Sequence, residues 1–154
     1  MDVNVVVEIP KGSRNKYEYD HDSGRIKLDR VLYSSVHYPA DYGFIEGTMG
    51  GDGDPLDALV LLEEPTFPGC LIACRPIGVF LMHDEKGDDE KVLCIAPADP
   101  TWNHIEEIDQ LPPHLLLEIE HFFQTYKHLE GKPTATFGWR DRAHAEKVVL
   151  ASRT

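Results

Sequence analysis

The spacing of the apolar residues changes once along this chain of 154 residues, and that change constrains the fold. Before Ala96 the apolar residues form short β-branched runs or alternate with polar residues, which is the pattern of β-strands. After Pro113 they recur in steps of three and four, which is the pattern of one helix face. Strands that precede helices in this way favour an α+β fold, mostly β, in which helices pack outside an antiparallel barrel or sheet.

Six segments are predicted to be strands: Val3–Ile9, Lys16–Asp20, Arg25–Asp29, Ala58–Leu62, Val92–Ala96 and Thr134–Phe137. The turn residues 21–24 join the second and third into a hairpin. His21 at its tip has two interpretations: a residue with no function, which is favoured, or one that contacts the site and tunes its pH response. Residues 31–45 are expected to form an extended loop and strand. Residues 71–82, interrupted by a proline and a glycine, are predicted to form two strands or one strongly bent strand. A charged loop is expected over residues 83–91.

Two helices are predicted in the last third of the chain. The first runs from Pro113, a residue suited to a first helical turn, to Leu129, and Gly131 would end it. Its apolar face consists of Leu115, Ile119, Phe122, Tyr126 and Leu129. The second covers residues 141–151, with Asp141 as its N-cap.

The length and the 42% of apolar residues predict a single domain, 1–154, with one core. No stretch approaches the roughly 20 consecutive apolar residues that a membrane-spanning helix needs, and the N-terminus does not read as a secretory signal. Cys70, Cys74 and Cys94 lie in apolar runs and lack a C-x-x-C spacing, so we expect reduced, buried thiols and no zinc site. These features predict a cytoplasmic protein with no membrane partner.

The segment Gly50–Leu62 places three carboxylates, those of Asp52, Asp54 and Asp57, within six positions. Carboxylates this close repel one another and raise each other's pKa unless a cation lies between them. Mg²⁺ and Ca²⁺ are hard cations that prefer oxygen ligands, carboxylates above all. The segment therefore predicts a metal site beside a strand.

Two other interpretations of this segment stay open on composition alone. Asp, Gly and Pro are common turn residues, so a solvated acidic turn has the same composition. A calcium-binding loop of the EF-hand kind fits poorly, because Leu56 and Asp57 stand where that pattern has Asp or Asn followed by Gly.

The net charge narrows the choice of partner. Fifteen basic and twenty-seven acidic side chains leave a formal charge of −12, which argues against a nucleic-acid partner. An anionic substrate would need metal ions and a few focused Lys and Arg side chains to reverse the sign of the charge locally. That combination is typical of metal-assisted phosphoryl chemistry.

Several segments resemble the soluble, metal-dependent inorganic pyrophosphatases of the bacterial type (family I). The signature D-[SGDN]-D-[PE]-[apolar]-D-[apolar] matches residues 52–58, DGDPLDA, at every position. Further matches follow in order along nearly the whole chain: EIPKG at 8–12, KYE at 16–18, DR at 29–30, YPADYG at 38–43, RPIGV at 75–79, DEKGDDEK at 84–91 and HFFQTYK at 121–127.

The resemblance implies a fold, an activity and a set of partners. The fold is an OB-like closed antiparallel β-barrel with two helices from the C-terminal region packed outside. The activity is hydrolysis of pyrophosphate to two orthophosphates by direct attack of a metal-activated water. The cofactor is Mg²⁺, several ions per site, with Mn²⁺ or Zn²⁺ as substitutes and Ca²⁺ as an inhibitor, and the assembly is a homohexamer.

The resemblance also implies a role for each matched residue. Asp54 is the expected general base, which accepts a proton from the attacking water. The expected metal ligands are Asp52, Asp57, Asp84, Asp89, Glu18 and Glu8. The expected phosphate-binding residues are Lys16, Arg30, Tyr42, Lys91, Tyr126 and Lys127, with Tyr38 as a supporting residue.

Two functions of other classes remain open. A calcium-binding or metal-buffering module needs the carboxylates but not the cations Arg30, Lys91 and Lys127. An OB-type binder of oligonucleotides or oligosaccharides is compatible with a barrel, but it calls for a basic groove, which the charge of −12 opposes. Both functions predict that Asp54→Asn is nearly silent, whereas the hydrolase predicts a large fall in turnover.

Overall fold

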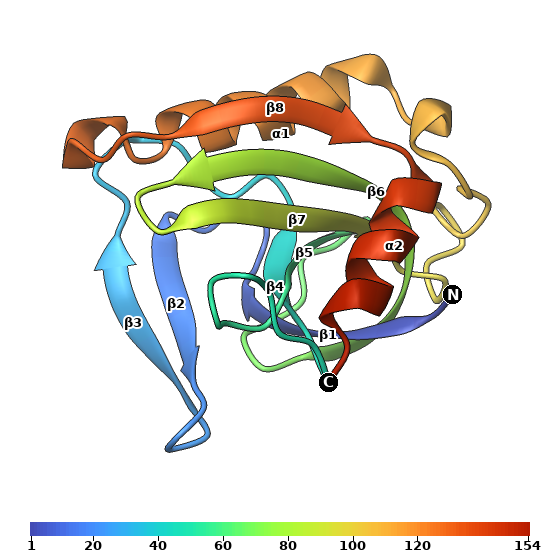
Figure 1. Cartoon of the computed structure of the whole chain (residues 1–154), viewed down its shortest axis with the longest axis horizontal. Coiled ribbons are helices and arrows are strands. Elements are labelled where there is room, and N and C mark those ends of the chain that lie inside the picture. Colours follow the sequence, from blue (N-terminus) through green and yellow to red (C-terminus); the bar gives the residue numbers. More distant parts are fainter.

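The computed structural model describes residues 1–154 and contains eight strands and two α-helices (Figure 1). The strands are β1 (Val3–Ile9), β2 (Asn15–Asp20), β3 (Arg25–Val31), β4 (Asp41–Ile45), β5 (Asp57–Leu61), β6 (Leu71–Asp84), β7 (Gly87–Ile95) and β8 (Ala135–Arg140). The helices are α1 (Pro113–Thr125) and α2 (Arg142–Ser152), and short 3₁₀ turns cover Ile108–Gln110 and His128–Glu130. All six predicted strands and both predicted helices are present.

Five strands close a ring in the order β1-β4-β5-β7-β6, because β6 also pairs with β1. The expected OB-like closed barrel is confirmed. Four of its pairings are antiparallel, but β5 and β7 run parallel, with Val60 opposite Cys94, which the expectation of an antiparallel barrel did not include. The parallel pairing is possible because the whole of β6 lies between these two strands in the chain and reverses the direction.

The segment predicted as two strands or one bent strand is one strand, β6, of 14 residues. Its first residues, Leu71–Cys74, pair with β1, and the remainder pairs with β7 and β8. The register with β7 shifts between Pro76 and Gly78, at a residue that has no N–H to donate. Because of this bend, β6 pairs with β1 through its first residues and with β7 through the remainder, which closes the ring.

The prediction of a loop over residues 83–91 is wrong. β6 continues to Asp84 and β7 begins at Gly87, so that only Glu85 and Lys86 form the turn of a hairpin. Gly87 has φ +115°, a conformation that favours glycine. The charged composition suggested a loop, but Asp84 and Asp89 pair with Lys127 and Lys91, and charged side chains leave the backbone hydrogen bonds of a strand intact. The hairpin therefore places Asp84 and Asp89 on strands.

Both faces of the central strands are buried. Along β5, Ala58 and Val60 belong to one apolar cluster and Leu59 and Leu61 to another, as the two-residue period of a strand requires. The helices complete these two clusters. α1 supplies Ile119, Phe122 and Phe123 to the Leu59 cluster, and α2 supplies Ala145, Val148 and Val149 to the Ala58 cluster.

α1 lies along β8 at the top of Figure 1, and α2 closes the side of the barrel beside β6 and β7. The predicted N-cap of α2 is confirmed, since the Asp141 carboxylate accepts a hydrogen bond from the His144 N–H at 3.0 Å. α1 ends at Thr125, short of the predicted end at Leu129, because the chain tightens into the 3₁₀ turn. Leu129 is consequently 68% exposed and does not belong to the buried face.

The predicted hairpin, β2–β3, projects from the barrel at the lower left of Figure 1 as a separate two-stranded sheet. The Tyr19 N–H donates a hydrogen bond to Glu8 Oε2 at 2.9 Å, which ties the hairpin to β1. At its other end Lys16 lies opposite Arg30, next to a register shift. The hairpin thus forms one wall beside the barrel.

The three cysteines are unpaired, and Cys74 and Cys94 are buried as expected, whereas Cys70 is partly exposed. No helix in the structure combines the length and the apolar character that crossing a membrane requires.

Candidate active site

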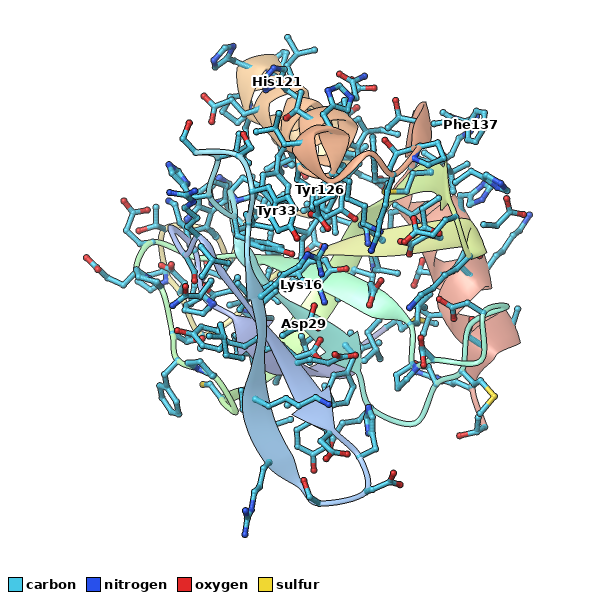
Figure 2. All side chains as sticks on the ribbon, turned by 90° about the vertical axis from the view of Figure 1, so that its left-hand side faces the viewer. Lys16, Asp29, Tyr33, His121, Tyr126 and Phe137 are labelled. Atoms are coloured by element: carbon cyan, nitrogen blue, oxygen red, sulfur yellow. The ribbon has the colours of Figure 1, made fainter.

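One cavity of about 320 Å³ opens between the barrel, the β2–β3 hairpin and the end of α1. Every residue predicted to act in the site lines it. Figure 2 looks onto this side of the molecule, where Lys16 and Asp29 of the hairpin lie below Tyr126. The structure therefore brings all of the predicted site residues together, although their individual roles remain predictions.

The predicted site residues that line the cavity come from six separate parts of the chain. They are Glu8 on β1, then Lys16, Glu18 and Arg30 on the hairpin, Tyr38 and Tyr42 at the start of β4, Asp52, Asp54 and Asp57 at the start of β5, Asp84, Asp89 and Lys91 on the β6–β7 hairpin, and Tyr126 and Lys127 after α1.

The acidic segment before β5 is a tight turn whose carboxylates lie at the rim of the cavity. The Gly50 N–H donates to the Asp54 carbonyl at 2.7 Å, and the Asp54 N–H donates to Asp52 Oδ1 at 3.0 Å. Gly53, between these two aspartates, has φ +86°. The side chains of Asp52 and Asp54 are exposed, and the chain enters the buried part of the strand after Asp57.

Lys91 is the buried cation of the site, with its side chain only 2% exposed. Its ammonium donates hydrogen bonds to Tyr42 Oη at 2.7 Å, Asp89 Oδ2 at 2.9 Å and Asp57 Oδ2 at 3.2 Å. The Phe123 ring lies 4.9 Å from Nζ and adds a cation–π contact. Burial lowers the pKa of Lys91, but the carboxylates and Tyr42 outweigh burial and hold that pKa well above its usual value.

The two carboxylates that flank Lys91 have opposite pKa shifts. Burial and the charge of Asp89 raise the pKa of Asp57 to about 7, against the opposing effect of Lys91. Burial also acts to raise the pKa of Asp89, but Lys91 and the hydrogen bonds that Asp89 accepts outweigh it and lower that pKa. The single ammonium of Lys91 is therefore shared between two carboxylates, and Asp57 is the one whose negative charge is less fully compensated.

The raised pKa of Asp57 predicts how stability depends on pH when no metal is bound. The folded state, with a pKa of about 7, binds more protons than the unfolded state, whose pKa is near 3.8, so stability falls as pH rises between these values. We expect Asp57→Asn to remove this loss. Urea unfolding with excess chelator should show that the free energy of unfolding falls more between pH 5.5 and pH 8 for the wild type than for the variant. Equal falls would contradict the assignment.

No three His, Cys, Asp or Glu side chains are arranged as a ready-made metal site. Lysines lie among the carboxylates instead, since Lys91 contacts Asp57 and Asp89, and Lys127 Nζ lies 3.4 Å from Asp84 Oδ2. The residues nevertheless fit a hard divalent cation. The available donors are carboxylate oxygens, and Asp57 shares its one cation, Lys91, with Asp89.

Sequence reasoning assigned no role to several cavity residues. Asp29 Oδ2 lies 3.1 Å from Lys16 Nζ and 2.6 Å from Arg30 Nη1, and Glu85 Oε1 lies 3.2 Å from Lys127 Nζ. Asp29 and Glu85 both lie within segments that match the family, and this match is the one sequence feature that could have indicated a role for them.

Lys132 and His21 also line the cavity. The His21 ring packs 4.8 Å from the Tyr19 ring and 5.1 Å from the Phe44 ring, so it belongs to the wall and not to an isolated hairpin tip.

Comparisons with known proteins agree with the resemblance. A family model described as inorganic pyrophosphatase matches residues 5–154. The inorganic pyrophosphatase of Methanosarcina mazei is 57% identical over 149 residues, which cover 97% of this chain and 88% of that protein, and that of Streptomyces coelicolor is 57% identical over 153 residues, which cover 99% and 94%. The crystal structure of inorganic pyrophosphatase from Thermus thermophilus superposes with a TM-score of 0.95 at 49% identity and covers 98% of this chain and 88% of that one. The chain belongs to the inorganic pyrophosphatase family.

Proposed function

We propose that this chain hydrolyses pyrophosphate to two orthophosphates and uses Mg²⁺ to do so. Inorganic pyrophosphatases carry out this hydrolysis, and the family is metal-dependent. The observation that carries the proposal is that one cavity holds both the carboxylates and the cations Lys16, Arg30, Lys91 and Lys127. A calcium-binding module does not require these cations, and an oligonucleotide binder does not require the carboxylates.

The carboxylates of Asp52, Asp57, Asp84 and Asp89 would hold the metal ions, with Glu18 and Glu8 at the hairpin side of the cavity. Bound there, divalent cations supply charge neutralisation of the phosphoryl oxygens and a lowered pKa of water. Glu8 is the less accessible of the two glutamates. Burial raises its pKa, and its Oε2 already accepts the Tyr19 N–H.

Asp54 is the proposed general base. Its position at the exposed rim of the cavity leaves the carboxylate open, while its backbone is fixed by hydrogen bonds to Gly50 and Asp52. A carboxylate that is free of internal hydrogen bonds can accept the proton of the attacking water, and a fixed backbone keeps it in place.

Six side chains are proposed to hold the two phosphoryl groups: Lys16, Arg30, Tyr42, Lys91, Tyr126 and Lys127. They come from four parts of the chain and line the same cavity, so that several positive charges can contact one dense anion. Tyr38 supports them, since its buried ring packs 5.4 Å from the Tyr42 ring and 4.7 Å from the Phe122 ring.

Mn²⁺ or Zn²⁺ would substitute for Mg²⁺, because the same oxygen donors accept them. Ca²⁺ is expected to inhibit, since it takes more ligands at longer distances and would change the geometry around the phosphates.

We also propose that residues 1–154 act as one domain in a homohexamer in the cytoplasm. Unpaired thiols support a reducing compartment. Large apolar side chains that are more than half exposed support subunit contacts, among them those of Tyr33, Phe67, Leu129, Phe137 and Leu150. A monomeric mass in solution at micromolar concentration would contradict the hexamer.

The proposed function is tested by product analysis. Purified protein with millimolar Mg²⁺ should release two phosphates for each pyrophosphate consumed. No phosphate from protein whose thermal transition shows that it is folded would reject the hydrolase and favour a metal-binding module.

A further inference from the structure

The guanidinium of Arg30, on β3, contacts the carboxylate of Glu130, a residue 100 positions later in the chain. Glu130 ends the 3₁₀ turn that follows Tyr126 and Lys127, and its side chain is only 4% exposed. Arg30 Nη2 donates to Glu130 Oε2 at 3.2 Å, and Arg30 Nε lies 2.9 Å from Glu130 Oε1. This contact joins two cavity walls that no secondary-structure pairing connects.

The contact decides which edge of the guanidinium faces the cavity. Arginine has five N–H groups in a planar fork. Glu130 faces the side edge, formed by Nε and one proton of Nη2, and Asp29 Oδ2 accepts one proton of Nη1 at 2.6 Å. One proton on each terminal nitrogen then remains, and these two form the end edge of the fork when Asp29 accepts the Nη1 proton on the Cδ side. That edge matches two oxygens of one phosphoryl group.

The buried Nε depends on Glu130 in particular. It has no hydrogen bond of good geometry in the structure, so its contact with Oε1 is the one compensation for its burial. A carboxylate beside an anion-binding group would otherwise be unfavourable, because it repels the substrate. A buried acid in this position is therefore explained by orientation of the guanidinium and not by the charge of the cavity.

We propose that Glu130 is a positioning residue, which orients Arg30 so that the end edge of its guanidinium meets a phosphoryl group of the substrate. The proposal rests on the proposed function, because it names the substrate that Arg30 contacts. Lys132 Nζ, 3.9 Å from Glu130 Oε1, balances part of the remaining charge.

Orientation and simple charge predict opposite effects of Glu130→Gln. If Glu130 acted only through its charge, its neutralisation would reduce repulsion and lower KM for pyrophosphate. If it orients Arg30, KM rises and kcat/KM falls, by about tenfold to a hundredfold, since small misplacements of a binding group have effects of that size. We expect the second result in steady-state assays at millimolar Mg²⁺.

A double-mutant cycle separates orientation from a general structural role. In an Arg30→Lys background there is no fork to orient, so Glu130→Gln should lower kcat/KM by less than about twofold. A structural role predicts that the two losses multiply. Glu106→Gln is the matched control, because Glu106 pairs with Arg142 at 2.7 Å and with Arg75 at 3.4 Å away from the cavity, and it should leave kcat/KM unchanged.

Glu130→Asp provides a second variant if the glutamine variant does not fold. It keeps the charge but shortens the reach, so a loss of kcat/KM in this variant supports orientation, and wild-type kinetics would overturn the proposal. A lower KM in Glu130→Gln, or multiplicative losses in the cycle, would overturn it as well. In each of these cases the wild type still hydrolyses pyrophosphate, whereas an inactive wild type would reject the proposed function itself.

Discussion

Asp54→Asn is expected to lower kcat for pyrophosphate by about a hundredfold to ten-thousandfold, the range over which a general base contributes. Asparagine has nearly the same shape as aspartate, so the turn should persist, since its hydrogen bonds use the Asp54 backbone N–H and C=O. What disappears is the group that accepts the proton. Turnover is measured by phosphate release, and Mg²⁺ binding by calorimetry without substrate should be largely retained.

Asp22→Asn is the matched control, because Asp22 is an exposed turn residue of the hairpin that does not line the cavity. It should leave kcat unchanged. A metal-buffering module or an oligonucleotide binder predicts that Asp54→Asn is as silent as this control. That outcome would remove Asp54 from the reaction.

Gly43→Ala is expected to destabilise the fold by about 3 kcal/mol or more, at the upper end of what overpacking costs. A Cβ at this position would lie 1.9 Å from the Val6 carbonyl oxygen and 2.9 Å from Val7 Cα. Both atoms belong to the backbone of β1, which pairs with β4 and with β6 and so cannot move without disturbing the ring. Urea unfolding of the wild type and the variant measures the difference.

Gly51→Ala is the control for the effect of a methyl group on glycine. A Cβ at Gly51 would meet nothing within 4 Å, and the residue does not have a positive φ. Its stability should stay within about 0.5 kcal/mol of the wild type, as for most surface changes. If Gly43→Ala were equally mild, the close approach of β1 and β4 in the structure would be wrong.

The strands were predictable where alternation or β-branched runs mark them, as in Val3–Ile9 and Ala58–Leu62. The β6–β7 hairpin was not, because its charged end lacks an apolar pattern and resembles a loop. The parallel pairing of β5 with β7 was also missed, since it depends on how β6 bends and not on any local signal.

The candidate site was predictable as a set of residues but not as a set of contacts. Matched segments named the acids and the cations, and all of them line one cavity. No pattern indicated that Lys91 would lie between Asp57 and Asp89 with its charge buried. The Arg30–Glu130 contact joins residues 100 positions apart, a separation over which local sequence carries no information.

The most direct test of the account removes the metal from the wild-type protein. Phosphate release from pyrophosphate is measured with millimolar Mg²⁺, then with excess chelator, then after Mg²⁺ is restored. We expect a rate that falls to background with chelator and returns with Mg²⁺, because the carboxylates and lysines of the cavity cannot lower the pKa of water by themselves. A rate that chelator leaves unchanged would contradict it.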